Sequence, residues 1–272
     1  MPARPACDRR PLPPSLKPVK LARDTWLVYQ RHMKLMLRNR TWLFFGLAQP
    51  VTYLLLFAPM LRIALRPMGA DSFADAYLIY VPGLLVVMCL YGGLFTGFAL
   101  LAELRAGIIE RCRVTPVSRS ALLLGRALRE VTSLLVQSAI VVVLAMPLGL
   151  RVHPLHLVAA FAMLALVALM TTTISYYVAL VYRNEGGLGP MINTVAQPVG
   201  LLAGVLLPLA LAPLWIQNVA LWNPFAWATH AMRAIFRGEM GDSVVWQGLA
   251  IVTLLSAVTV VFTSRAFART VR

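Results

Sequence analysis

Six long apolar stretches constrain the fold of this chain more than any other feature of its sequence. None of them contains Asp, Glu, Lys or Arg. A helix that crosses a bilayer needs roughly 20 consecutive apolar residues. They run over residues 42–61, 76–102, 131–150, 155–182, 188–213 and 244–264. The sequence therefore predicts an all-α polytopic membrane protein, with six transmembrane helices in a domain of residues 41–272.

The composition and charge agree with a membrane protein. Of the 272 residues, 60% are hydrophobic and only 13% are charged, whereas soluble domains are nearer to half and a quarter. The formal net charge of +15 favours cytoplasmic segments that face anionic lipid, so no nucleic-acid partner is expected. The three cysteines, Cys7, Cys89 and Cys112, form neither a metal motif nor a disulfide scaffold.

The basic residues predict the orientation of the chain in the membrane. Twenty of the 25 Lys and Arg lie before the first stretch, in the links after the second and fourth stretches, or in the tail after the sixth stretch. Cytoplasmic loops carry such an excess of positive charge. We therefore expect a multi-pass protein of the plasma membrane with both termini in the cytoplasm.

The N-terminal region divides into two segments. Residues 1–19 are basic and rich in proline, which predicts a disordered tail. Residues 20–40 carry six basic side chains and an apolar stripe that includes Trp26 and Tyr29. This pattern predicts an amphipathic helix that lies in the membrane interface.

Two links between the stretches are longer than simple connections. In the cytoplasmic link, 103–130, the apolar residues before Pro116 favour a short helix at the membrane surface, and Ser118 is a candidate cap for a helix that runs into the third span. In the outer link, 214–243, tryptophans surround a helix expected after Asn223 and ended by Gly238. We expect this outer segment to re-enter the interface without crossing the bilayer, because a crossing would place charges in lipid.

The motifs of an enzyme are missing from the sequence. No P-loop pattern occurs, since none of the lysines follows a glycine, and the histidines are scattered. No pair of carboxylates lies within an apolar stretch, because Glu103 and Glu130 are assigned to the cytoplasmic link. We therefore expect neither a catalytic site, nor a metal site, nor a cofactor bound by this chain.

Uncharged polar, aromatic and methionine side chains within the stretches are candidates for a substrate path. Helix-to-helix hydrogen bonding or ordinary packing is the alternative for each of them. The polar candidates are Gln49, Gln137, Thr171, Thr172, Thr173, Ser175, Asn193 and Gln197. Tyr91 and Phe95 add aromatic rings, and Met191 adds an adaptable apolar surface.

Three local patterns give the chain a resemblance to a known family. They are QPVTYLLLF at 49–57, ERCRVTPVSRSALLLGRAL at 110–128 and NPFAWATHAMRAIFRGE at 223–239. With these patterns the chain resembles the membrane subunit of the ABC type-2 exporters, a group that includes daunorubicin-resistance permeases and nodulation lipo-oligosaccharide exporters. The second pattern, between the second and third spans, is the most specific.

The resemblance implies a permease that works with separate subunits. Two ABC ATPase subunits would hold the ATP and Mg, and a second copy or a paralogous permease would complete the membrane part. The 20–40 helix would be the connecting helix, and the cytoplasmic link would contain the coupling helix that docks on the ATPase. The implied coupling residues are Gly107, Ile109, Glu110, Arg111, Arg113, Thr115 and Pro116.

The substrate class stays open at this point. A hydrophobic or amphipathic drug, antibiotic or lipid is the first expectation, because the fifth stretch has no aromatic residue to line a sugar channel. Export of a glycolipid or polysaccharide by the same architecture is one alternative. A membrane scaffold or immunity protein that transports nothing is the other.

Overall fold

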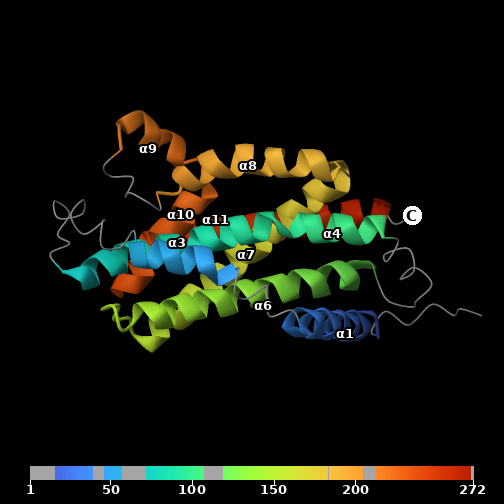
Figure 1. Ribbon diagram of the computed structural model, residues 1–272, viewed down its shortest axis with the longest axis horizontal. Helices are drawn as coiled ribbons and strands as arrows, with labels where there is room; N and C mark the ends of the chain where they lie inside the picture. Colours follow the sequence, from blue (N-terminus) through green and yellow to red (C-terminus); the bar gives the residue numbers. More distant parts are fainter. Residues whose placement is uncertain are drawn as a thin grey trace, which may run out of the picture.

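The computed structural model describes residues 16–38, 46–56, 72–106, 119–182, 184–204 and 212–270, and these residues form helices and turns without a strand. The helices are α1 (Leu16–Arg38), Gly46–Leu56, α3 (Phe73–Leu94), α4 (Thr96–Arg105), α6 (Arg119–Ala145), α7 (Pro154–Tyr182), α8 (Glu185–Leu201), α9 (Leu214–Ala220), α10 (Pro224–Arg237) and α11 (Ser243–Thr270). The all-α class expected from the sequence is confirmed for this part of the chain (Figure 1).

Four helical segments within the described residues are long and apolar enough to cross a bilayer. They are α3 with α4, which continue through a turn at Phe95, and α6, α7 and α11. The helix Gly46–Leu56 and the 17-residue α8 lie within or overlap the first and fifth expected spans, but neither described length reaches a full span. The structure thus supports a multi-spanning bundle, and the six-span arrangement stays a prediction.

Helix α7 lies at the centre of the bundle and packs against α3, α4, α6, α10 and α11. Small residues bring α3 and α4 close to it. A Cβ added to Gly93 would overlap the Thr171 hydroxyl, and the backbone amide of Gly97 donates to Ser175 Oγ at 2.9 Å. Close approach through small and hydroxyl residues is typical of packed membrane helices. The hydroxyls of Thr171, Thr173 and Ser175 therefore link α7 to neighbouring helices, whereas Thr172 Oγ1 lacks a hydrogen-bond partner among the described residues.

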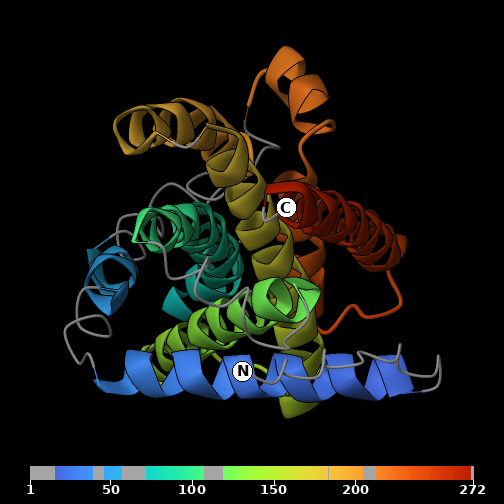
Figure 2. The same ribbon diagram turned by 90° about the vertical axis from the view of Figure 1, so that its right-hand side faces the viewer.

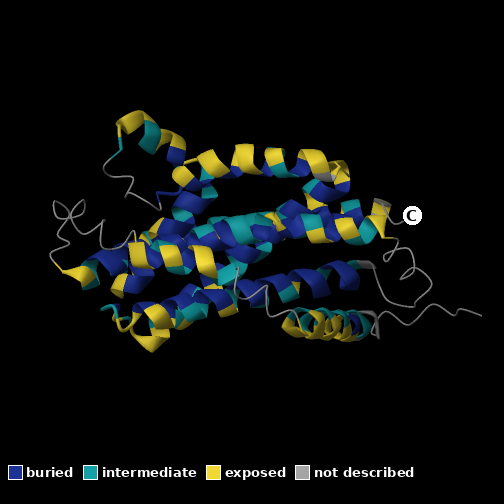
Figure 3. Ribbon diagram, in the orientation of Figure 1, coloured by how far each residue is buried: buried dark blue, intermediate teal, exposed yellow. Residues whose placement is uncertain are grey.

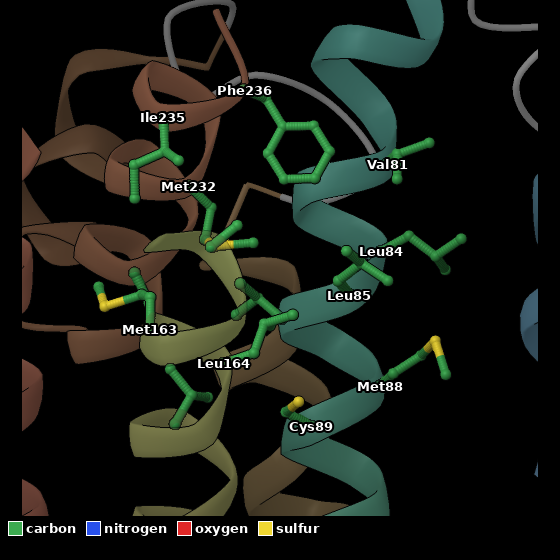
Figure 4. Packing of buried hydrophobic residues seen from close by; sticks show 14 of the residues in the cluster. Val81, Leu84, Leu85, Met88, Cys89, Met163, Leu164, Met232, Ile235 and Phe236 are labelled. Atoms are coloured by element: carbon green, nitrogen blue, oxygen red, sulfur yellow. The ribbon is translucent and has the colours of Figure 1, made fainter. Parts of the chain in front are cut away.

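The main hydrophobic core lies where α3, α7 and α10 meet. Leu85 and Cys89 of α3 face Leu164 of α7, and Met232 of α10 lies beside them (Figure 4). On the other side of α3, Met88 points away from α7 and α10, although it belongs to the same buried cluster (Figure 4). Helix α3 therefore packs against the bundle on one side and leaves the other side to line the candidate site.

The outer link contains two helices. Asn223 caps α10, with its side chain accepting from the Phe225 amide at 3.1 Å, and Gly238 ends the helix at a φ of 89°. The helix expected between these two residues is therefore present. It packs against the ends of α3, α7 and α11, whereas most of α9 is exposed (Figure 3).

Helix α1 runs across the direction of the long helices (Figure 2). It begins at Leu16, four residues before the expected amphipathic helix, and packs on α6 near Gly125. A Cβ on Gly125 would lie 2.8 Å from the Thr25 carbonyl oxygen, so glycine permits this crossing. Trp26 stacks on Tyr29 with ring centroids 5.1 Å apart, and Trp26 and Leu37 are largely exposed.

Candidate functional site

A pocket opens between the helix Gly46–Leu56, α3, α6 and α8. Its volume is about 530 Å³, within the range of small-molecule sites. The lining residues are Gly46, Gln49, Pro50, Tyr53, Tyr80, Leu84, Val87, Met88, Tyr91, Gly92, Phe95, Glu130, Ser133, Leu134, Gln137, Asn193, Gln197, Gly200 and Leu201. Apolar walls with a few polar side chains are the usual make-up of a ligand site.

One stripe of α6 forms a wall of this pocket. Glu130, Ser133, Leu134 and Gln137 follow each other at helical positions i, i+3, i+4 and i+7, which places them on one face. All four are buried, and Ser133 Oγ lacks a hydrogen-bond partner within the described part of the chain. Buried polar atoms ordinarily have partners. The stripe therefore offers a free hydroxyl beside a carboxylate inside the pocket.

Two ion pairs involve the N-terminal half of α6, one to a neighbouring helix and one within α6 itself. Arg126 pairs with Glu103 of α4, and the Arg129 guanidinium lies 2.8 Å from the Glu130 carboxylate. Glu103 and Glu130 were expected in the cytoplasmic link, but the structure places each of them inside a candidate span. Ionisable residues at such places are rare, normally paired, and often functional.

The structure brings together most of the residues expected along a substrate path. Tyr91 and Phe95 come from α3 and its C-terminal turn, and Asn193 and Gln197 come from α8. Gln49 and Gln137 join them from two further helices. Met191, which was grouped with these residues, is not among the pocket-lining side chains.

A buried arginine connects α10 to two of the elements that line the pocket. Arg233 of α10 donates from Nε to the Ile79 carbonyl oxygen at 3.0 Å and from Nη2 to the Gly204 carbonyl oxygen at 2.6 Å. Nearby, Asn223 donates from Nδ2 to the Val199 carbonyl oxygen at 2.8 Å. These bonds tie the outer link to α3 and to the C-terminal end of α8, two of the elements that line the pocket.

Comparison with known proteins finds a family whose model matches most of the chain. Residues 23–236 match the model of the ABC-2 type transporter family. The chain belongs to the ABC-2 type transporter family. It is 26% identical over 220 residues to the daunorubicin resistance ABC transporter permease protein DrrB1 of Streptomyces coeruleorubidus, covering 80% of this chain and 76% of the relative. It is 23% identical over 226 residues to a putative transport permease, ycf38, of Porphyra purpurea, with 82% and 77% covered.

Family membership confirms the resemblance inferred from the three sequence patterns. ABC-2 permeases work with ABC ATPase partners and lack a nucleotide-binding domain of their own. The segment expected to meet the ATPase lies outside the described residues. This applies to every implied coupling residue, namely Gly107, Ile109, Glu110, Arg111, Arg113, Thr115 and Pro116.

Sequence reasoning missed several residues that line the pocket of this ABC-2 permease. Tyr53 and Tyr80 were not selected, yet both line the pocket, and the Tyr80 hydroxyl lies 3.5 Å from the Tyr53 carbonyl oxygen. Glu130 was missed because the third span was expected to start at Val131, and Ser133, which lies inside that span, was not selected among its polar residues. The spacing of Glu130, Ser133 and Gln137 was the available signal, since it puts three polar side chains on one helical face.

Proposed function

We propose that this chain is the membrane-spanning subunit of an ATP-driven exporter of a hydrophobic or amphipathic compound. The observation that carries the proposal is the pocket between α3, α6, α8 and the helix Gly46–Leu56. It combines four amide side chains with aromatic and aliphatic walls inside a bundle of apolar helices. The apolar part of a compound would pack against these walls, and its few polar groups would bond to the amide side chains.

Alternating access would make this pocket a transport site. The bundle would rock between a form in which the pocket opens to the cytoplasm or inner leaflet and a form in which it opens outward. ATP can drive that change only through its different affinity for the two forms. We therefore place the pocket on the export path of the substrate.

The energy would come from two separate ABC ATPase subunits that hold ATP and Mg. In this proposal the coupling segment, Gly107–Pro116, docks on an ATPase and transmits its closure to α4 and α6, which flank the segment. A second copy or a paralogous permease would supply the other half of the membrane part.

We further propose that the protein lies in the plasma membrane with both termini in the cytoplasm. Helix α1, the C-terminal end of α4, the N-terminal end of α6 and the C-terminal end of α11 lie toward the same end of the bundle (Figure 1). Among the described residues, most of the Lys and Arg belong to these elements, as is typical of the cytoplasmic side. With its orientation across the long helices, α1 would rest along the cytoplasmic membrane interface as an amphipathic connecting helix.

The test is copurification with the ATPase encoded nearest to this gene, followed by ATP hydrolysis in lipid nanodiscs. Glu110→Ala should weaken the stimulation of ATP hydrolysis by the permease, because a charged contact of the coupling segment is lost. Glu239→Ala is the matched control, since Glu239 is exposed in the outer link. A stable complex that responds only to Glu110→Ala supports the proposal, and the lack of any complex with an ABC ATPase overturns it.

A further inference from the structure

The charged side chain that lines the pocket is negative. Glu130 is the single charged residue among the described side chains that line it, and neither Lys, nor Arg, nor His belongs to that lining. The remaining polar groups are amides, tyrosines and one serine. A bound phosphate or carboxylate would therefore meet a carboxylate without a balancing cation in the pocket wall.

The ion pair with Arg129 leaves part of the Glu130 carboxylate available to a ligand. Arg129, the next residue on α6, pairs with Oε1 of Glu130 at 2.8 Å, and Arg129 is not part of the pocket wall. An ionised carboxylate has about four lone-pair directions. It can hold Arg129 on one side and still accept a contact from the pocket.

The position of Glu130 inside the bundle strengthens the interactions of its charge. It lies eleven residues from the start of α6, about 16 Å along the helix axis, and inside a candidate span. Charge interactions are stronger there than in water, because the surroundings are poorly polarisable. Such a carboxylate can distinguish ligands by the sign of their charge.

The aromatic residues favour the same sign. Tyr53, Tyr80, Tyr91 and Phe95 all contribute to the lining. The faces of aromatic rings attract cations, especially when water is excluded. The unpartnered Ser133 hydroxyl, one helical turn from Glu130, could accept a hydrogen bond from the same ligand group.

We infer that the pocket selects lipophilic cations, such as apolar compounds with a protonated amine, and that Glu130 is its charge-selective residue. This inference rests on the proposed function for its biological meaning, but binding alone can test it. It narrows the substrate class from hydrophobic or amphipathic compounds in general. It also disfavours phosphate-bearing glycolipids, which would bring negative charge to the Glu130 carboxylate.

The experiment compares two probes of nearly equal shape and opposite charge. The purified full-length permease, in nanodiscs of neutral phosphatidylcholine, is titrated with tetraphenylphosphonium and with tetraphenylborate, and empty nanodiscs give the background. We expect the cation to bind more tightly, after subtraction of its lipid partitioning. Glu130→Gln should weaken cation binding by about tenfold or more. ATPase partners are absent from this measurement, so a failed exporter assignment and a failed charge preference are distinguished.

Two further variants keep the test decisive. Glu103→Gln is the matched control, because Glu103 is also a paired carboxylate near α6 but does not line the pocket. Asn193→Lys adds a cation to an exposed pocket residue and should weaken tetraphenylphosphonium binding even if Glu130→Gln fails to fold. Equal affinity for both probes, tighter binding of the anion, or equal effects of Glu130→Gln and Glu103→Gln would overturn the inference.

Discussion

The Arg233 guanidinium of α10 donates a hydrogen bond from Nε to the carbonyl oxygen of Ile79 in α3, over 3.0 Å. Pro82 lies one turn further along α3. A proline inside a helix lacks an N–H and disturbs the preceding turn. Arg233 therefore supplies a donor to a turn of α3 that the proline disturbs, and it links the outer helices to the wall of the pocket.

Replacing Arg233 should destabilise the outer end of the bundle. Arg233→Met would leave the carbonyl oxygens of Ile79 and Gly204 without these donors, at a cost of about 2 kcal/mol or more. We expect a lower unfolding temperature in detergent than for the unmodified protein. Arg237→Met, one turn along α10 at an exposed position, is the control and should leave the unfolding temperature nearly unchanged. Equal losses in both variants would contradict a specific role of Arg233.

A side chain at Gly93 should separate α3 from α7. In Gly93→Ala the new Cβ would overlap Thr171 Oγ1 and lie 3.1 Å from the backbone nitrogen of Thr172. Overpacking of this kind typically costs about 1–3 kcal/mol. We expect a lower unfolding temperature and weaker binding of pocket ligands, whereas Gly241→Ala, which meets open space, should change neither. An unchanged Gly93→Ala protein would show that the two helices pack less closely.

The contact of α1 with α6 should weaken in mild acid. Burial, with the nearby Arg126, Arg129 and Arg31 guanidiniums, lowers the pKa of His32 from 6.5 to about 4. Between these two values, His32 takes up a proton when α1 is released but stays neutral when α1 is packed. Packing should therefore be strongest above about pH 6.5 and become weaker as the pH falls toward 4.

Hydrogen exchange of the α1 amides, corrected for the intrinsic effect of pH, measures this change. We expect α1 to lose protection between pH 7 and pH 4.5 relative to α7. The variant His32→Gln has no proton to gain and should keep the same α1 protection over that range. Identical pH profiles for the two proteins would exclude His32 as the titrating group.

Local sequence signals predicted some elements closely. The fourth stretch, expected at 155–182, is α7 at Pro154–Tyr182, and Asn223 with Gly238 marked both ends of α10. In each case the signal lies in the element itself: a long apolar run beside a proline, or a cap and a glycine. These parts of the fold were therefore available without knowledge of the neighbouring helices.

Other features depend on contacts between distant residues. The third span was expected from Val131, because Arg126, Arg129 and Glu130 read as a polar link, yet α6 begins at Arg119. The partner that makes Arg126 tolerable inside the bundle, Glu103, lies on another helix. The pocket is likewise built from four helices, so only part of its lining could be predicted from the sequence.

The fifth stretch shows how local breaks shorten a helix. It was expected to run to Pro213, but α8 ends at Leu201, and Gly204 follows at a φ of 69°. Pro198 and the glycines nearby weaken the helix at this point. Counting apolar residues alone could not locate that end.

A bulky side chain on the pocket face of α8 should block export. Gln197 is exposed and lines the pocket, so Gln197→Trp would fill the volume with an indole ring without disturbing the core. Val195 is exposed on the same helix, about 160° away at 100° per residue, and does not line the pocket. We expect Gln197→Trp to lower ATP-dependent export from proteoliposomes at least about tenfold while ATPase binding persists, and Val195→Trp to export normally. Export by Gln197→Trp at the unmodified rate would exclude this pocket from the substrate path, because an indole ring and a substrate cannot occupy the same space.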